Sequence, residues 1–321
     1  MSYKQIIRMQ KTMTKQVGGY HHPRTQPRKP LKISIRQQAE HLLHGRLTTR
    51  DLELVRALIG VGMLTRQQIQ RLFFGNHPKV ASNRLARLYH YHFLDRSSYW
   101  LEDMGPEGFE PCYIYTVGAV GLEAFALRMG VGRGDVPFTP ARYTLSREDH
   151  FLLHDLRISE MFTQLQVGAK EIGEELLWFN ESAAILRREQ EELVRPDGIA
   201  VLIGAQRHTP FFIEMDRGYT DWPKKVAAYE KARQQSPWPV TLRVDSWRPS
   251  VFPTVLCVVP AALEGMVQKE IESKRPQTKF YIQSWERFLA ADIFVNWYDS
   301  SSGQIVALLP EMGNRAVTQP L

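Results

Sequence analysis

Arg195-Pro196-Asp197-Gly198 opens the stretch that decides the fold of the second half of this 321-residue chain. An apolar run at residues 199–203 follows, and after a polar turn a second apolar run at residues 210–213 ends on Glu214. Two short apolar runs joined by a turn are typical of an antiparallel pair of buried strands. Such a pair places Asp197 and Glu214 at the same end, where two carboxylates repel each other unless a cation relieves the repulsion.

This arrangement resembles the core of the PD-(D/E)xK nucleases, the restriction-endonuclease-like fold. The resemblance implies that Asp197 and Glu214 bind Mg²⁺, which activates water for phosphodiester cleavage. The family pattern has a lysine two residues after the glutamate, but this sequence has Asp216 there. Asp216 could add a third carboxylate, and Lys225 on the following helix could replace the missing lysine. Tyr229, four residues further along the same helix face, would then orient Lys225 or a DNA phosphate.

The opposing interpretation is a nuclease fold that no longer catalyses. In that case the acidic residues hold loop geometry, with Asp197 capping a turn and Asp216 paired with Arg217 or Arg195. Because Asp216 stands where the catalytic lysine is expected, we take this non-catalytic interpretation as the main hypothesis. A metal-dependent nicking endonuclease is the alternative.

The composition indicates a globular protein with room for two domains. Hydrophobic residues make up 43% of the chain and charged residues 23%. No apolar run approaches the roughly 18–20 residues that a membrane span needs, and no signal-peptide-like segment stands near the start. Cys112 and Cys257 are the only cysteines, which excludes a disulfide framework and a cysteine-rich zinc site. We therefore expect a cytoplasmic protein without a membrane partner.

The net charge of +7 is concentrated at the N-terminus. Residues 1–46 hold ten Lys or Arg and one acid, Glu40, which gives +9, so the remaining 31 basic and 33 acidic residues give −2. Gly18, Gly19 and three prolines interrupt this segment, and we predict a basic disordered arm with one short helix near residues 35–43. A basic arm commonly binds a polyanion, although a solubilising leader without a partner is the alternative.

Residues 47–130 show the element order of a winged helix-turn-helix domain. Helix signals begin at Thr48 and at Thr65, a third helix is predicted from Lys79 to about His90 with Val80, Leu85 and Leu88 buried, and two strands and a helix follow. In this class of domain the third helix enters the DNA major groove and the hairpin is the wing, although some members dock proteins instead. The candidate DNA contacts are Gln67, Lys79, Ser82, Asn83, Arg84, Arg87 and Arg96.

A Gly- and Pro-rich linker at residues 131–146 leads to a second domain at residues 147–298, and residues 299–321 are predicted to be a C-terminal tail. The apolar patterns of this second domain predict the order αβββαβαβα, which is the order of the restriction-endonuclease-like core. In that core a glutamate on the first helix can join the metal site. Glu160, on the predicted long helix that begins near Ser146, is therefore a further candidate metal ligand.

Several of these motifs occur in an order that resembles the bacterial replication-relaxation family of plasmids and mobile elements. They are the N-terminal winged helix, residues 154–160 (His-Asp-Leu-Arg-Ile-Ser-Glu), Trp178 with Glu181, residues 195–198, residues 212–218, and Lys225 with Tyr229. The resemblance covers roughly residues 48–290 and implies a role in plasmid replication initiation, DNA relaxation or mobilisation.

The sequence as a whole predicts an α/β protein that binds double-stranded DNA through a winged helix and carries a nuclease-like second domain. Mg²⁺ is the only cofactor that the nuclease resemblance implies. Plasmid replication or mobilisation proteins are expected partners, and a homodimer is left open. A pure protein-docking adaptor is the third alternative, but such an adaptor would not need positive charge concentrated beside the helix-turn-helix.

Overall fold

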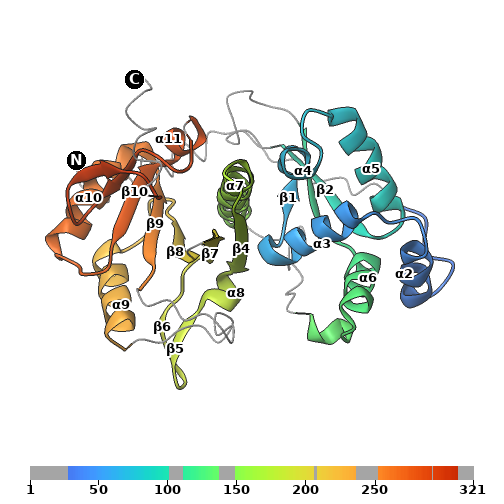
Figure 1. Cartoon of the computed structure of the whole chain (residues 1–321), viewed down its shortest axis with the longest axis horizontal. Helices are drawn as coiled ribbons and strands as arrows, with labels where there is room; N and C mark the ends of the chain where they lie inside the picture. The colour runs from blue at the N-terminus through green and yellow to red at the C-terminus, as the bar shows by residue number, and fades with distance from the viewer. Residues whose placement is uncertain are drawn as a thin grey trace. The chain divides into compact units, whose positions relative to one another are not determined.

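The computed structural model describes residues 28–100, 111–136, 149–205, 208–235, 252–290 and 292–309. The described residues form two compact units that divide after Thr163, and Figure 1 shows their elements. We describe each unit by itself. The turn of the predicted hairpin, a Gly- and Pro-rich segment at residues 103–111, lies outside the described residues except for Pro111, and so does most of the predicted linker.

The N-terminal unit has the helix and strand order that the sequence predicts for a winged helix. Its three strands pair antiparallel in the order β1-β3-β2, so β2 and β3 form the hairpin that follows the third helix. The elements are α2 (Ile35–Leu43), α3 (Thr49–Val61), β1 (Leu64–Thr65), α4 (Arg66–Phe73), α5 (Pro78–His90), β2 (Leu94–Trp100), β3 (Pro111–Val117), α6 (Ala119–Met129) and the 3₁₀ turn η1 (Arg133–Asp135).

Local sequence signals set the helix starts in this unit. The backbone N–H and the hydroxyl of Thr48 both donate to the Asp51 carboxylate, which closes the first turn of α3. Thr65 and Gln68 form a reciprocal capping box at α4, in which each side chain accepts from the other residue's backbone N–H. Helix α5 begins with Pro78 in its first turn. The backbone N–H of a first-turn residue has no acceptor within the helix, so the missing N–H of proline costs nothing there.

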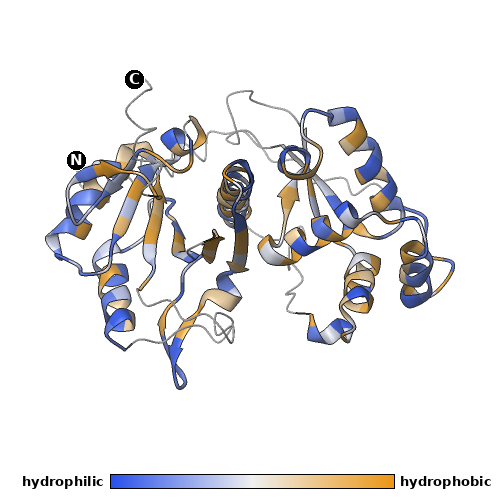
Figure 2. Cartoon of the chain, viewed as in Figure 1, coloured by the Kyte–Doolittle hydropathy of each residue, from blue (hydrophilic) through white to orange (hydrophobic). Residues whose placement is uncertain are grey.

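The predicted buried stripe of α5 is wrong at its first position. Val80 is 54% exposed, whereas Ala81, Leu85 and Leu88 are fully buried. Counting 100° per residue, Ala81 and Leu88 lie on the same side of the helix as Leu85, and Val80 lies far round from it. Figure 2 shows the resulting mixture of hydrophilic and hydrophobic positions along α5.

The predicted disordered arm is too long, because its second part is folded. Helix α2 confirms the short helix predicted near residues 35–43, but this helix packs into the unit: it begins at a Ser34 capping box and buries Ala39 and Leu42 completely. Before it, the Arg28 guanidinium donates to the Leu94 carbonyl at 2.9 Å and forms an ion pair with Asp95 on β2. Residues 28–46 therefore belong to the N-terminal unit, and only residues 1–27 lie outside the described part of the arm.

The C-terminal unit confirms the predicted order αβββαβαβα and adds short elements to it. Its core elements are α7 (Asp149–Glu171, which also contributes residues to the N-terminal unit), β4 (Glu175–Asn180), β7 (Gly198–Ile203), β8 (His208–Met215), α9 (Trp222–Gln235), β9 (Thr254–Val259), α10 (Glu264–Ser273), β10 (Phe280–Ser284) and α11 (Trp285–Ala290). The additions are α8 (Glu181–Ala184), β5 (Leu186–Arg188), β6 (Glu191–Val194), η3 (Ala261–Leu263), β11 (Trp297–Asp299) and β12 (Gln304–Val306).

Seven strands form one mixed sheet in the order β12-β11-β10-β9-β8-β7-β4. Strands β8, β9 and β10 run parallel, and the other neighbours pair antiparallel. Because β11 and β12 extend this sheet, the predicted domain boundary at residue 298 is too early. A buried cluster from β7, β8, β9, β10, α9 and α10 forms the core, while the tip of the β5–β6 hairpin is hydrophilic (Figure 2).

The described residues contain no helix that combines the length and the apolar character needed to cross a bilayer.

Candidate functional site

The register of β7 and β8 brings Asp197 and Glu214 to one end of the strand pair, as the sequence predicts. Gly198 pairs with Ile213, and the Asp197 backbone N–H donates to the Ile213 carbonyl at 2.9 Å. The side chain of Asp197 turns back to β8, where its Oδ2 accepts the Met215 backbone N–H at 2.7 Å. This bond fixes the direction of the half-buried Asp197 carboxylate relative to the end of β8.

Glu214 is a buried carboxylate held by two side chains of α9. Its Oε1 lies 2.8 Å from Lys225 Nζ and accepts a hydrogen bond from the Tyr229 hydroxyl at 2.5 Å, while only 5% of the residue is exposed. Burial raises the pKa of Glu214 to about 7, and the neighbouring Asp197 adds to this rise. Lys225 and Tyr229 act in the opposite direction, because both stabilise the charged carboxylate.

Lys225 supplies a cation beside Glu214 from the following helix, at the place where the sequence lacks the expected lysine. Its ammonium also donates to the Arg195 carbonyl at 2.9 Å, which ties α9 to the start of the 195–198 motif. Burial alone would lower the pKa of Lys225, but Glu214 and then Asp197 outweigh burial and raise it. Lys225 is therefore protonated at neutral pH.

Tyr229 acts on Glu214 and is inaccessible to DNA. Its side chain is fully buried and its ring packs 5.5 Å from Phe212 and 5.7 Å from Phe280, measured between ring centroids. The predicted contact of Tyr229 with a DNA phosphate is therefore wrong. Its hydroxyl also donates to Glu214 and not to Lys225, so it positions the carboxylate rather than the lysine.

Asp216 holds the loop after β8, and its carboxylate is already satisfied. Oδ1 accepts the backbone N–H groups of Gly218, Tyr219 and Thr220 and the Thr220 hydroxyl, and Oδ2 accepts the Trp222 indole N–H at 2.9 Å. A third metal-binding carboxylate would have to break these bonds. Asp216 therefore binds the N–H and hydroxyl groups of this loop instead of the predicted partners Arg217 or Arg195.

The two arginines proposed as neutralising partners have other contacts. Arg195 binds Glu192 through two guanidinium nitrogens, at 2.9 and 2.7 Å, and contacts Glu181 at 3.4 Å. The guanidinium of Arg217 lies over the Tyr219 ring, 5.9 Å from its centroid. The cation in contact with Glu214 is therefore Lys225. The sequence suggested Lys225 only as a substitute for the missing catalytic lysine.

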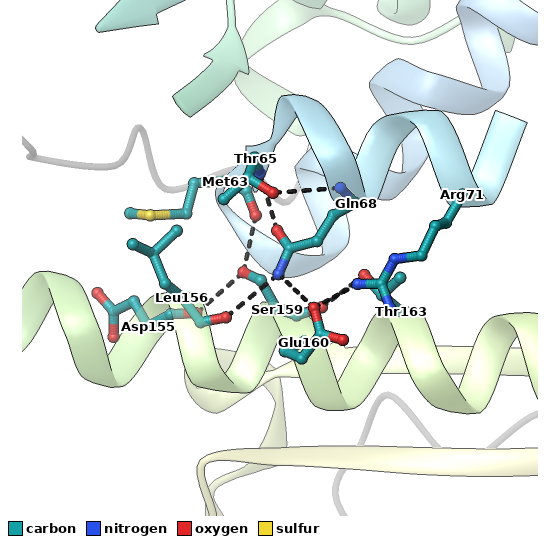
Figure 3. Close-up of polar contacts among 9 residues, drawn as sticks. All are labelled: Met63, Thr65, Gln68, Arg71, Asp155, Leu156, Ser159, Glu160 and Thr163. Carbon is teal, nitrogen blue, oxygen red and sulfur yellow. Dashed lines mark hydrogen bonds and ion pairs between the residues drawn. The ribbon is translucent and has the colours of Figure 1, made fainter. Parts of the chain in front are cut away.

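Glu160 belongs to a polar network of the N-terminal unit (Figure 3). Its Oε2 accepts a hydrogen bond from Gln68 at 3.0 Å and forms an ion pair with Arg71, both on α4. On the same helix, the Ser159 hydroxyl donates to the Met63 carbonyl at 2.7 Å. The predicted metal role of Glu160 is therefore replaced by a structural one. The capping-box pattern revealed Gln68 as a helix cap, but it carried no signal for the contact with Glu160.

Two carboxylates remain as candidate ligands for a divalent cation. Magnesium is commonly bound through one or two carboxylates, with water and substrate phosphate completing its octahedron. Asp197 and Glu214 fit that demand, although Lys225 and Tyr229 already share one Glu214 oxygen. The described part of the chain holds no cluster of three or more His, Cys, Asp or Glu residues suited to a metal ion.

The candidate DNA-binding residues divide into exposed and structural groups. Lys79, Asn83 and Arg87 are exposed along one face of α5, Gln67 is exposed on α4, and Ser82 is half-buried. Positions four and eight residues apart on a helix point in similar directions, so Lys79, Asn83 and Arg87 form a continuous face. In winged helix-turn-helix domains in general, the third helix is the one that enters the DNA major groove.

Arg84 is not part of this exposed face. Its Nε donates to Asp51 Oδ1 at 2.9 Å, a second nitrogen pairs with Asp51 Oδ2, and the same nitrogen donates to the Arg46 carbonyl at 2.8 Å. Burial alone would raise the pKa of Asp51, but hydrogen bonds from Arg84 and Thr48 hold it below its ordinary value. The predicted DNA contact of Arg84 is therefore replaced by an ion pair that ties α5 to α3.

Arg96 on β2 is packed between aromatic rings. Its guanidinium lies 4.4 Å from the Tyr89 centroid and 4.5 Å from the Tyr113 centroid, and its hydrogen bond to Tyr115 opposes the rise in the pKa of that phenol caused by burial. A guanidinium over an aromatic face is attracted by the ring's quadrupole, so Arg96 links β2 to Tyr89 of α5 and to Tyr113 of β3. Arg96 therefore packs within the N-terminal unit, a role that the predicted DNA contact from the wing does not account for.

Comparison with known proteins places the chain in a family. Residues 55–241 match the replication-relaxation family, and because this match covers more than half of the chain, the chain belongs to that family. A search of curated proteins gives no match. A solved structure of restriction endonuclease FokI bound to DNA aligns with 75% of this chain and 43% of the FokI chain, at 14% identity and a TM-score of 0.27. That score is too low to support an argument about fold or function. The chain spans less than half of the FokI chain.

Proposed function

We propose that this protein binds duplex DNA through the exposed face of α5 and serves DNA replication or relaxation on a plasmid or mobile element. The observation that carries the proposal is the exposure of Lys79, Asn83 and Arg87 along one face of a helix that contains no acidic residue. Lysine and arginine neutralise phosphates, and arginine and asparagine also recognise base edges in the major groove. Membership of the replication-relaxation family supports the DNA-related role.

The order of elements and the charge of the preceding segment also support DNA binding. Helix α5 follows α2, α3 and α4 in its unit, and the hairpin of β2 and β3 comes directly after it. Residues 1–27 add five Lys or Arg and no acid, so the chain that leads into Arg28 is strongly basic. Cations on both the helix and the arm suit a polyanionic partner.

In this proposal the C-terminal unit acts as a DNA-associated scaffold without cleavage. Lys225 and Tyr229 already satisfy one oxygen of Glu214, and Asp216 holds a loop. The further candidate ligand, Glu160, contacts α4 within the N-terminal unit. The partners would be plasmid replication or mobilisation proteins that meet the DNA-bound chain. A second copy of this chain is a further candidate partner.

The experiment compares the full-length wild type with Arg87→Ala and Lys79→Ala by fluorescence anisotropy on a mixed-sequence duplex. Both variants should bind the duplex more weakly while their melting temperatures stay within about 2 °C of the wild type, because both side chains are exposed. A charge-conserving Arg87→Lys variant is the matched control, and it should retain most of the non-specific affinity. Unchanged affinity in both alanine variants would move DNA binding away from α5.

A second candidate function is metal-dependent nicking of DNA, and the contact between Lys225 and Glu214 favours it. The two strands and α9 bring together an aspartate, a glutamate and a lysine, which is the residue set that the nuclease resemblance calls for. A bound Mg²⁺ would polarise a phosphodiester and lower the pKa of water. This chain would contribute Asp197 and Glu214 as its ligands, with Lys225 orienting Glu214 and adding positive charge beside the phosphate.

A further inference from the structure

Helix α5 carries an exposed apolar side chain on the same surface as its polar face. Val80 is 54% exposed in the first turn of α5, between exposed Lys79 and Asn83. A helix that only contacts phosphates gains nothing from a valine there, because an isolated β-branched residue slightly lowers helix propensity. The neighbouring cations make an apolar protein surface a poor partner for this turn, and point to a ligand that is anionic and also offers a methyl group.

We infer that α5 reads an A·T-containing step in the major groove, with Val80 against a thymine methyl and Asn83 on an adenine. This inference rests on the proposed binding of duplex DNA by α5. Among the base edges of the major groove, the thymine C5 methyl is the apolar group, and asparagine pairs with adenine N6 and N7. Residues in the N-terminal part of a recognition helix are those that reach the bases.

The spacing of the two side chains fits neighbouring base pairs. Val80 and Asn83 are three residues apart, which is about 4.5 Å along the helix axis and about 60° in rotation from each other. Successive bases along one strand are separated by about 3.4 Å. Val80 and Asn83 can therefore engage adjacent steps, while Arg87, about 6 Å further along the axis, reaches a guanine or a phosphate beyond them.

Arg84 does not take part in the proposed base recognition, which narrows the set of α5 side chains that can contact bases. The Asp51 carboxylate and the Arg46 carbonyl hold its guanidinium against α3. A helix face with Arg84 available would favour guanine at a second position. With Arg84 occupied, the exposed side chains of the first two turns of α5 are Pro78, Lys79, Val80 and Asn83, and Ser82 is half-buried.

The test begins with selection of a preferred duplex from a randomised library by the full-length wild type. Each thymine of that duplex is then replaced by uracil, which differs only by the missing methyl group. We expect one position at which uracil weakens wild-type binding about fourfold, which is the affinity change that the burial of one methyl group accounts for. Val80→Ala should bind the thymine duplex more weakly and lose most of its sensitivity at that position.

A second arm replaces adenines by 7-deazaadenine, which lacks the N7 acceptor. Wild-type binding should weaken at an adenine next to the sensitive thymine, and Asn83→Ala should be indifferent to that replacement. A selected duplex with no uracil-sensitive position, or a Val80→Ala variant that keeps the sensitivity, overturns the inference while DNA binding by α5 stands. If Lys79→Ala and Arg87→Ala leave DNA affinity unchanged, the proposed function fails and this inference fails with it.

Discussion

Lys225 Nζ lies 2.8 Å from Glu214 Oε1, so a helix residue nine positions after Asp216 supplies the cation that the position of Asp216 lacks. Glu214 is thus a buried carboxylate of the C-terminal unit with a cation in contact with it. Burial opposes its charge, and Lys225 and Tyr229 partly restore it. The stability of this unit should therefore depend on the protonation of one side chain.

We predict that the free energy of unfolding falls as the pH rises from about 4.5 to about 7. The pKa of Glu214 is about 7 in the folded protein and its ordinary value is 4.5, so in this window the folded state binds a proton that the unfolded state has lost. The stabilisation is complete below the ordinary pKa and is lost as the pH passes the folded pKa. Urea denaturation at a series of pH values measures the slope.

Glu214→Gln should flatten this pH dependence, because an amide keeps the shape and the Tyr229 contact without titrating. The matched control is Glu192→Gln, at a carboxylate whose pKa the Arg195 guanidinium lowers, so that it titrates below the window. That control should keep the wild-type slope. An unaltered slope in Glu214→Gln would show that another group titrates there.

Arg84 and Arg87 should separate stability from DNA binding on a single helix. Arg84→Ala removes one partner of an ion pair in which Asp51 is only 1% exposed, and should lower the free energy of unfolding by about 2–4 kcal/mol. Arg87→Ala should change stability by no more than about 0.5 kcal/mol and should lower DNA affinity instead. Chemical denaturation and anisotropy on the same two variants measure both effects.

The Asp51–Arg84 pair should also make the free energy of unfolding depend on pH under acid conditions. Because the pKa of Asp51 is lowered in the folded protein, its stabilisation is present above the ordinary value of 3.8 and is lost as the pH falls. Arg84→Ala should therefore cost less stability at about pH 3 than at pH 7. An equal cost at both pH values would mean that packing of the arginine stem, and not the ion pair, stabilises the contact between α3 and α5.

Truncation should distinguish the two parts of the N-terminal segment. Deleting residues 1–27 removes five basic residues and no acid, so DNA affinity should become less salt-dependent, with a slope smaller by up to about 4. Deleting residues 1–46 also removes α2 with its buried Ala39 and Leu42, and should lower the melting temperature. If the shorter deletion leaves the salt slope unchanged, the first 27 residues do not contact DNA.

The sequence predicted the long elements well because their apolar patterns are periodic over many residues. The helix-start signals at Thr48 and Thr65 placed two helix starts correctly, and the carboxylates at the ends of β7 and β8 are together as expected. The misses have physical reasons. The apolar side chain of Val80 predicts a core position, but the rotation of α5 carries Val80 away from Leu85 and leaves it exposed.

The remaining differences come from short elements and from long-range contacts. Strands β5, β6, β11 and β12 have three or four residues each, too few to show an alternating pattern. Three of the partners of Asp216 are backbone N–H groups of a loop, which no side-chain pattern reports. The ion pairs of Glu160 with Arg71 and of Arg84 with Asp51 join residues 89 and 33 positions apart, so their pairing depends on the fold.

The response to divalent cations should distinguish a scaffold from a nuclease. If Lys225 has taken over the neutralisation of Glu214, Mg²⁺ or Mn²⁺ should leave the melting temperature of the full-length protein unchanged, and supercoiled plasmid should remain intact. A cation that bound at a hundred times its Kd would instead add about 2.7 kcal/mol of stability. Differential scanning calorimetry with and without metal distinguishes the two results.

The variants make the outcome specific to this site. In the scaffold, Glu214→Ala should lower stability, because it removes the ion-pair partner of Lys225 and the acceptor of the buried Tyr229 hydroxyl, and should leave DNA affinity unchanged. In a nuclease, the wild type would nick supercoiled plasmid only with metal, and Asp197→Asn and Glu214→Ala would abolish both the nicking and the thermal shift. Lys225→Met would then lose the nicking while retaining part of the thermal shift, since it removes a cation and no ligand. Because one Glu214 oxygen already receives two hydrogen bonds from α9, we expect the scaffold result, and metal-dependent nicking that Glu214→Ala abolishes would contradict it.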